Sequence, residues 1–370
     1  MRAERSGLDG FAQDLRAYRV ILGGRVPSYV RIVDLLLERL EEGGFPARVR
    51  ERIEDAWRER GFNAAYDRPA LLIAAIRADA LAEGPSHPLF RAVAVDVPDP
   101  GAVTADALVA ALAPERDRLW RALAANRVQT NETARAIAWL WPLALAGAGD
   151  GERPVALVDL GASAGLNLVA DALPAIWTDA ERGDPIPVAR APRIVSRLGI
   201  DARPIDARDD AAVAWLRACL WPGEMRRLAR FDAAVAAFRE ASRSPAPPSV
   251  ETGDLRSAGR RLRAVAGASP RGTLVLAYQT LVREYLPPAV RAEYLEGVRS
   301  FLEDAPPGSA LWVELEMTWD GDVPRDALLT AHAKGRDGRV VELGLGRCGY
   351  HPVAVSVDRA AAAALARVFG

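Results

Sequence analysis

The stretch at residues 155–171, VALVDLGASAGLNLVAD, constrains the fold of this chain more than any other segment. Its first six residues form a short apolar run typical of a buried strand, and small residues then lead into a helical pattern. A strand, a glycine turn and a helix in succession are typical of α/β proteins with parallel sheets. Such sheets bind ligands beyond the carboxyl ends of their strands, where this turn would lie.

The chain before residue 126 has a different pattern. Apolar residues recur there at helical spacing, interrupted by Gly and Pro, and no segment has the pattern of a strand. NETARAIAWLWPLALAG, at 131–147, predicts one further helix before the first strand. We therefore expect a helical region over residues 1–125 and an α/β domain over residues 126–370.

The segments after the glycine turn continue the α/β alternation. Strand-like runs SVETGD, TLVLAYQT and ALWVELEM are separated by helical patterns at 209–242, 255–266 and 288–304. This alternation predicts a mostly parallel sheet with helices on both faces. Near the C-terminus, GRVVELGLGRCG and HPVAVSVD follow one another almost directly, which predicts a C-terminal antiparallel hairpin.

Composition excludes several classes of protein. The chain has 370 residues, 50% of them hydrophobic and 26% charged, with a net charge of −1, so it has no overall field that attracts nucleic acid or an anionic membrane. No apolar run is long enough to span a bilayer, and the N-terminus lacks the apolar core of a signal peptide. Cys219 and Cys348 form neither a disulfide framework nor a metal set. We expect a cytoplasmic protein without a metal site, and its oligomeric state stays open.

Two phosphate-binding motifs do not match the turn. The dinucleotide motif G-x-G-x-x-G has glycine where this chain has Gly161, Ser163 and Leu166, so two positions fail. The P-loop requires a lysine that this turn lacks.

A serine hydrolase motif, G-x-S-x-G, is matched literally by Gly161, Ser163 and Gly165. The nucleophile elbow of such hydrolases is followed in the chain by an acidic residue and then a histidine. However, we expect His332 in a polar loop and His351 between two hairpin strands, and no segment evidently supplies the second donor of an oxyanion hole. A hydrolase that uses Ser163 remains one alternative.

The glycine-rich first motif of S-adenosylmethionine-dependent methyltransferases fits better. Val158-Asp159-Leu160-Gly161 and the three following small residues up to Gly165 match it, with Ser163 in place of the middle glycine. Small residues let the backbone approach a ligand, and the helix that follows begins with free amides. The Asp159 carboxylate would orient the loop or contact the cationic methionine end. The other interpretation is that these small residues only permit tight strand–helix packing.

Several motifs beside the turn resemble one family. RVQTNETAR precedes the turn, and RLGIDARPID and LWPGEMRRLARFDAA follow it. Together with GASAGLNL they resemble a bacterial domain family of unknown function, DUF2332, over most of the chain from SHPLF at 86–90 to the terminal hairpin. The resemblance implies a methyltransferase-like Rossmann core and brings no established reaction.

The segment RVQTNETAR carries more polar groups than a helix start requires. Arg127, Asn131 and Arg135 are spaced by four, which would place them on one face of a continuous helix. Asn131 as a helix cap is the structural alternative. In methyltransferase-like folds the helix before the first strand packs over the cofactor, so the resemblance implies that Gln129, Asn131 and Arg135 contact the substrate or form a lid.

Three acidic residues are candidates for the nucleoside. Asp201 in LGID would end the second strand and accept hydrogen bonds from the ribose hydroxyls, with Asp206 as the competing candidate. Asp254 in VETGDL would end the third strand, where methyltransferases contact the adenine amino group. The alternative for Asp254 is an N-cap of the helix that follows.

The fourth strand would end with Tyr278, Gln279 and Thr280, and Tyr285 follows closely. The position after this strand faces the transferred methyl group in the resembled fold, which makes Tyr278, Gln279 and Tyr285 candidates for the substrate side. The leading hypothesis is S-adenosylmethionine-dependent methyl transfer to a small-molecule acceptor. A non-catalytic protein on the same fold, binding a nucleoside ligand or a partner, is the second alternative.

Overall fold

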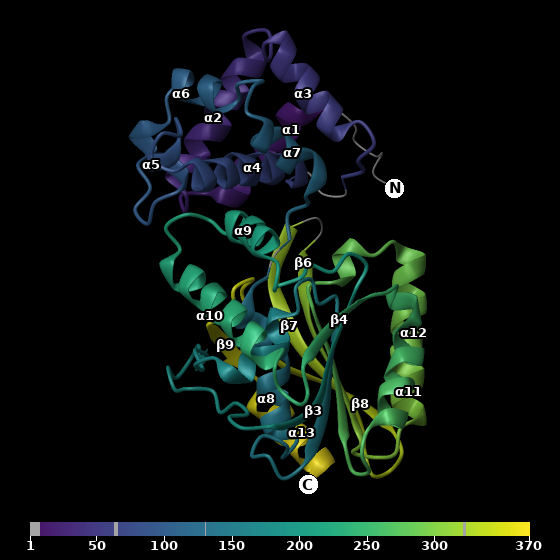
Figure 1. Cartoon of the computed structure of the whole chain (residues 1–370). Coiled ribbons are helices and arrows are strands. Elements are labelled where there is room, and N and C mark those ends of the chain that lie inside the picture. The colour runs from purple at the N-terminus through teal and green to yellow at the C-terminus, as the bar shows by residue number, and fades with distance from the viewer. Residues whose placement is uncertain (1–7, 63–65, 130, 321–322) are drawn as a thin grey trace. The chain divides into compact units, whose positions relative to one another are not determined.

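The chain forms two compact units, shown in Figure 1. The computed structural model describes residues 8–62, 66–129, 131–320 and 323–370. Unit 1 comprises Met1–Thr130 and Asp210–Ala229, and unit 2 comprises Asn131–Asp209 and Arg230–Gly370. The segment Asp210–Ala229 therefore packs with the N-terminal helices, although it lies far along the chain from them.

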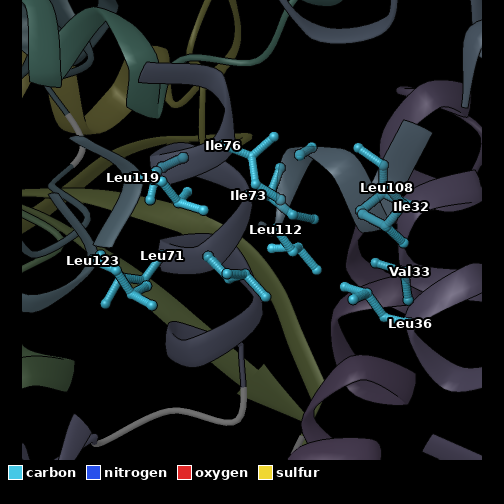
Figure 2. Packing of buried hydrophobic residues seen from close by; sticks show 14 of the residues in the cluster. Ile32, Val33, Leu36, Leu71, Ile73, Ile76, Leu108, Leu112, Leu119 and Leu123 are labelled. Carbon is cyan, nitrogen blue, oxygen red and sulfur yellow. The ribbon is translucent and has the colours of Figure 1, made fainter. Parts of the chain in front are cut away.

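The described part of unit 1 contains helices and no strand. Its α-helices are α1 (Phe11–Leu22), α2 (Pro27–Glu41), α3 (Ala47–Trp57), α4 (Asp67–Glu83), α5 (Phe90–Val93), α6 (Ala105–Ala111), α7 (Asp117–Ala125) and α9 (Asp210–Cys219). Helix α4 is buried on nearly all sides, which requires neighbours around it. Figure 2 shows Ile73 and Ile76 of α4 packed among leucines of the adjacent helices.

The described strands of unit 2 form one nine-stranded, mostly parallel sheet. The strands are β1 (Pro154–Leu160), β2 (Thr178–Asp179), β3 (Arg193–Asp201), β4 (Pro248–Thr252), β5 (Leu274–Thr280), β6 (Ala310–Asp320), β7 (Val323–Lys334), β8 (Val340–Cys348) and β9 (Ala354–Val357). Their order is β2-β9-β8-β7-β6-β5-β1-β3-β4. Neighbours from β4 to β6 run parallel, and neighbours from β6 to β9 run antiparallel.

The strand order reverses at β1. From β1 the chain moves outward through β3 and β4, and it then returns to β5 on the other side of β1. A reversal of this kind opens a crevice outside the carboxyl ends of the two central strands. Asp159 near the end of β1 is in register with Tyr278 of β5, so both residues lie at this crevice.

Helices cover both faces of the sheet, as Figure 1 shows. Helices α8 (Ile137–Leu145) and α13 (Arg359–Phe369) pack on one face, against side chains such as Leu157 and Leu276. Helices α11 (Ala258–Ala268) and α12 (Pro288–Asp304) pack on the other face, against side chains such as Val158 and Trp312. Helix α10 (Met225–Ala241) begins in unit 1 and ends in unit 2.

The segment Val323–Lys334 is a strand, β7, and this corrects the expectation of a polar loop around His332. Ala327, Leu329, Ala331 and Ala333 are buried, and this alternation is typical of a strand with one face in the core. His332 is itself only 5% exposed, stacked 4.3 Å from Trp312 of β6. The predicted C-terminal hairpin is confirmed as the antiparallel pair β8–β9.

The expected helix over 131–147 begins later than predicted. A 3₁₀ turn, η2 (Thr133–Ala136), precedes α8, and Glu132 is extended. The Glu132 carboxylate accepts a hydrogen bond from the Ala134 amide and so caps this turn. Arg127, Asn131 and Arg135 consequently do not share one helix face, and Glu132 rather than Asn131 is the cap.

Candidate functional site

The glycine turn adopts left-handed backbone at three alternating positions. Gly161, Ser163 and Gly165 have φ values of +95°, +53° and +70°. A Cβ on Gly161 would lie 2.5 Å from Val282 Cγ2, and one on Gly165 would lie 2.6 Å from Val250 Cγ2. Both glycines are therefore required by the packing of unit 2, and the segment after them is a 3₁₀ helix, η3 (Leu166–Ala172), rather than the expected α-helix.

Every backbone amide of the turn has an acceptor within the chain. Gly161 and Ala162 donate to Ile200 O, Ser163 to Asp201 Oδ2, Ala164 to Asn131 Oδ1 and Gly165 to Ala162 O. Buried backbone donors need such acceptors, so this pattern stabilises the turn itself. A ligand at this edge of the sheet must therefore be recognised mainly by side chains, or must displace one of these acceptors.

Asn131 lies directly against the turn. Its Oδ1 accepts from the Ala164 amide at 3.2 Å, and its Nδ2 donates to Ser163 Oγ at 3.1 Å. The structure thus brings a residue of RVQTNETAR to the glycine turn, as the sequence predicts, although through an extended segment and not a helix. A side chain bonded to two residues of the turn can release both groups at once if a ligand displaces it.

Asp159 is the buried acidic group of the site, with 3% of its surface exposed. Tyr278 Oη donates to Asp159 Oδ2 at 2.8 Å, and Oδ1 has no hydrogen-bond partner among the described residues. Burial raises the pKa of Asp159 to about 7; the Tyr278 hydrogen bond acts in the opposite direction, and the nearby charge of Asp201 raises it further. Burial and the Asp159 charge also raise the pKa of Tyr278, so that the phenol stays protonated and donates.

Asp201 is the last residue of β3, where the sequence places it, and it holds the turn. Its Oδ2 accepts from the Ser163 amide at 2.7 Å, and its Oδ1 accepts from the Arg203 amide at 2.8 Å. The competing candidate, Asp206, is instead paired with Arg208 on the surface. Of the two, only Asp201 contacts the glycine turn.

Asp254 follows β4 and caps the short helix η4 (Leu255–Ser257), as its structural alternative predicts. It accepts from the Arg256 amide at 2.8 Å and forms an ion pair with the Arg256 guanidinium. The hydrogen bond from the Arg256 side chain is the main reason that the pKa of Asp254 is lowered. Its carboxylate is thus occupied within its own turn.

Tyr278 and Gln279 point to opposite faces of the sheet, because side chains alternate along a strand. Tyr278 lies toward α8, with its ring 6.4 Å from that of Trp139. Gln279 is fully buried toward α12, where it donates to Glu316 Oε1 at 2.7 Å and accepts from Tyr294 and Trp312. Only Tyr278 therefore contacts the Asp159 side of the sheet.

Glu316 holds the loop that follows β5. Its Oε1 accepts from the Val282 amide at 3.1 Å and from the Arg283 amide at 3.3 Å. Burial raises the pKa of Glu316 to about 7, while its hydrogen bonds act in the opposite direction. Leu281, in the same loop, has the unfavourable φ of +55°, so Glu316 stabilises a strained turn whose Val282 packs on Gly161.

The remaining sequence candidates lie apart from these contacts. Gln129 belongs to unit 1, where its backbone is hydrogen bonded to the Cys219 thiol. Arg135 is buried in unit 2 and donates from Nε to the Tyr350 carbonyl at 3.2 Å. Tyr285 is 53% exposed in the turn η5 (Arg283–Tyr285).

One further pair of residues, His351 and Glu132, was not predicted from the sequence. His351 Nδ1 lies 2.8 Å from Glu132 Oε2, with 31% of the histidine side chain exposed and 4% of the glutamate side chain. Arg230 lies near enough to interact electrostatically with Glu132, and its guanidinium lies 5.3 Å from the centre of the Trp177 ring. Glu132 follows Asn131 in the sequence, and that adjacency to a candidate site residue was the available signal.

The match to a known family covers both units. The bacterial family described as "Uncharacterized protein conserved in bacteria (DUF2332)" matches residues 23–356. The chain belongs to this family. No curated protein and no solved structure matches it.

Metal-binding clusters and membrane-spanning helices are both absent from the described residues of this DUF2332 protein. These residues contain no group of three or more His, Cys, Asp or Glu side chains placed to hold a metal ion. Among them, no helix combines the length and the apolar character that crossing a membrane requires. The glycine turn of the DUF2332 chain, with Asn131, Asp159, Asp201 and Tyr278, is thus the best-defined candidate site.

Proposed function

We propose that unit 2 binds S-adenosylmethionine beside the glycine turn and transfers its methyl group to a small molecule. Asp159 is the observation that carries this proposal. It is a buried carboxyl group at the strand-order reversal, and one of its oxygens has no hydrogen-bond partner among the described residues. Oδ1 is not one of the fully buried polar atoms that lack a partner, so a ligand can reach it, and an amine-bearing cation there would supply a donor.

The topology supports the same proposal. The parallel order β4-β3-β1-β5-β6, with acidic residues at or just beyond the ends of β1, β3 and β4, fits a methyltransferase-like Rossmann domain. Fold alone does not determine a reaction, so the site residues must carry the functional argument.

The acidic residues fit this cofactor in part. Asp159 and Asp201 give the site negative charge, which complements the sulfonium and ammonium groups. Asp201 already accepts two amides, yet a carboxylate has about four acceptor positions and can take a ribose hydroxyl as well. Asp254 would have to leave Arg256 before it could accept from adenine. When bound, the cofactor supplies an activated methyl group, so the chain supplies position and exclusion of water.

A non-catalytic ligand-binding protein on the same fold is the second candidate. The observation that favours it is the closed turn, in which Asn131 and Asp201 occupy amides that a cofactor would approach. Such a protein would bind S-adenosylhomocysteine and would not consume the methyl donor.

The geometry gives less support to a serine hydrolase. Ser163 Oγ accepts from Asn131, whereas the three histidines contact other partners: His87 lies near Asp79, His332 near Glu314 and His351 near Glu132. A fluorophosphonate probe tests this alternative directly, because it labels an activated serine.

Calorimetric titration of the purified protein with S-adenosylmethionine and S-adenosylhomocysteine tests the proposal. We expect micromolar binding of both compounds. Mass spectrometry of the denatured protein should be run in parallel, because a nucleoside carried through purification would mask binding. If neither compound binds and no nucleoside is carried, the proposal is wrong.

We also propose that the protein acts in the cytoplasm. Cys219 and Cys348 are both free thiols, as expected in a reducing compartment. Fractionation of cells that produce the protein would test this proposal.

A further inference from the structure

We propose that His351 and Glu132 form the proton-accepting pair of this site, and that the methyl acceptor is therefore a small molecule with an O–H or N–H group. The proposal rests on the proposed methyl transfer and adds a base and a substrate class to it. From the sequence, His351 was considered only as the histidine of a serine hydrolase, and Glu132 was not a predicted site residue.

The two side chains have complementary environments. Glu132 is buried, and its Oε1 is fixed by the Ala134 amide at 3.0 Å, so Oε2 is left to face His351 Nδ1 at 2.8 Å. His351 is partly exposed, and its Nε2 has no hydrogen-bond partner among the described residues. This arrangement is typical of a general base: a buried carboxylate lies at one nitrogen of the imidazole ring, and the other nitrogen is accessible.

His351 Nδ1 lies within ion-pair distance of Glu132 Oε2, but the angles between the two groups are not those of a hydrogen bond. Catalytic hydrogen bonds are often poorly aligned in unliganded proteins and tighten when substrate binds. Arg135 restrains the neighbouring loop through its hydrogen bond to the Tyr350 carbonyl.

The pair and the glycine turn are linked through one segment of the chain. Glu132 directly follows Asn131, and consecutive Cα atoms are about 3.8 Å apart. Asn131 contacts both Ser163 and Ala164 of the turn. The base and the proposed cofactor site are therefore held by neighbouring residues of one segment.

Proton balance gives the acceptor class. S-adenosylmethionine, when bound, would supply a methyl group without a proton and be left as S-adenosylhomocysteine, so a neutral acceptor that is to give a neutral methylated product must lose one proton from an O–H or N–H group. His351 takes this proton at Nε2, and the freed electron pair of the acceptor oxygen or nitrogen forms the bond to the methyl carbon. Glu132 stabilises the imidazolium, whose exposed side then returns the proton to solvent.

The first test asks whether His351 Nε2 is accessible, and it needs no ligand. The chain has three histidines, and His87 and His332 are almost fully buried. Diethyl pyrocarbonate should therefore modify His351 first, as located by mass spectrometry of the peptides. If His351 stays unmodified while either of the others reacts, or if none of the three reacts, the assignment as a base is wrong.

The second test measures transfer from methyl-labelled S-adenosylmethionine to two groups of probes. Phenols, alcohols and primary amines can lose a proton, whereas thioethers and tertiary amines cannot. We expect transfer only to the first group. His351→Gln should lower the rate about 100-fold or more, the range of general-base catalysis, and Glu132→Gln should lower it about tenfold. Val353→Ala, an exposed change in the same loop, is the matched control and should leave the rate unchanged.

Calorimetry on the same variants separates the possible failures. Affinity for S-adenosylmethionine should stay within about twofold in His351→Gln, because the residue acts on the acceptor. If the wild-type protein binds the cofactor but methylates only proton-free probes or none, or if His351→Gln keeps its rate, the base assignment alone is overturned. If the wild-type protein does not bind the cofactor, the proposed function falls and this inference falls with it. Labelling of Ser163 by a fluorophosphonate would assign the pair to a hydrolase and would also overturn the inference.

Discussion

Two buried carboxyl groups, Asp159 and Glu316, lie on opposite faces of the same sheet and differ in how fully they are hydrogen bonded. Burial raises the pKa of each to about 7. Asp159, on the α8 face, has one donor, the Tyr278 hydroxyl. Glu316, on the α12 face, accepts from the Gln279 side chain and from the Val282 and Arg283 amides.

From this difference we infer a structural role for Glu316 and propose a binding role for Asp159. Glu316 uses its oxygens to hold the loop after β5, whose Val282 packs on Gly161 of the turn. Asp159 holds no backbone amide, and one of its oxygens has no partner among the described residues. A buried carboxyl group with a single donor, the Tyr278 hydroxyl, costs free energy, so we infer that Asp159 is retained for a ligand.

Replacing Glu316 with alanine should have the largest effect on stability. It removes the acceptor for two buried donors and one partly buried donor, and a buried donor left unsatisfied costs about 1–3 kcal/mol. We expect the free energy of unfolding to fall by about 2–4 kcal/mol, measured by urea denaturation. Glu316→Gln keeps an acceptor oxygen and should lose less; equal losses in the two variants would contradict the structural role.

The pH dependence of stability should be the next largest effect. The pKa of Asp159 is raised from 3.8 to about 7, so the folded protein binds more protons than the unfolded chain between these values. The free energy of unfolding contributed by this group is therefore lost as pH rises from about 4 to about 7, by up to about 1.4 kcal/mol per pH unit. Glu316 contributes with the same sign.

Asp159→Asn isolates the Asp159 contribution. The difference in free energy of unfolding between the variant and the wild type should shift in favour of the variant by about 1–3 kcal/mol when the pH is raised from 5 to 8. Urea denaturation of both proteins at pH 5 and at pH 8 measures this shift. A relative stability that does not change with pH would show that Asp159 ionises normally in the folded protein.

Ser163→Gly should have the smallest effect. It restores the glycine that the methyltransferase motif has at this position and relieves a non-glycine residue at φ +53°. It also removes the hydrogen bond from Asn131, and these opposing effects are each about 1 kcal/mol. We expect a thermal midpoint within a few degrees of the wild type, whereas Ser163→Val should be clearly destabilised because a β-branched residue is strained at positive φ.

The sequence predicts the local parts of this molecule well. The apolar run before Gly161 identifies β1, and the positions of Asp159 and Asp201 at strand ends follow from the same patterns. Helical spacing predicts the helical character of the region before residue 126, although not the short helix α5, and it does not show that the pattern at 209–242 is two helices, α9 and α10. These features depend on residues that are close in the sequence, and the spacing of apolar residues is enough to predict them.

Contacts between distant segments could not be predicted in the same way. Glu132 and His351 meet only because the loop after β8 returns to the segment before α8. Strand β7 was missed because an arginine and an aspartate near its start interrupt the alternation that continues from Ala327 to Ala333. One error was avoidable: alternation along β5 requires Tyr278 and Gln279 to face opposite sides of the sheet.

The most direct test of the difference between Asp159 and Glu316 is the affinity of Asp159→Asn and Glu316→Gln for S-adenosylmethionine, measured by calorimetry against the wild type. We predict that Asp159→Asn weakens binding by about tenfold or more, as expected for the loss of a hydrogen bond to a charged group, while Glu316→Gln binds within about threefold of the wild type despite its lower stability. Wild-type affinity in Asp159→Asn, or an equal loss in both variants, would contradict the division of roles between the two carboxyl groups.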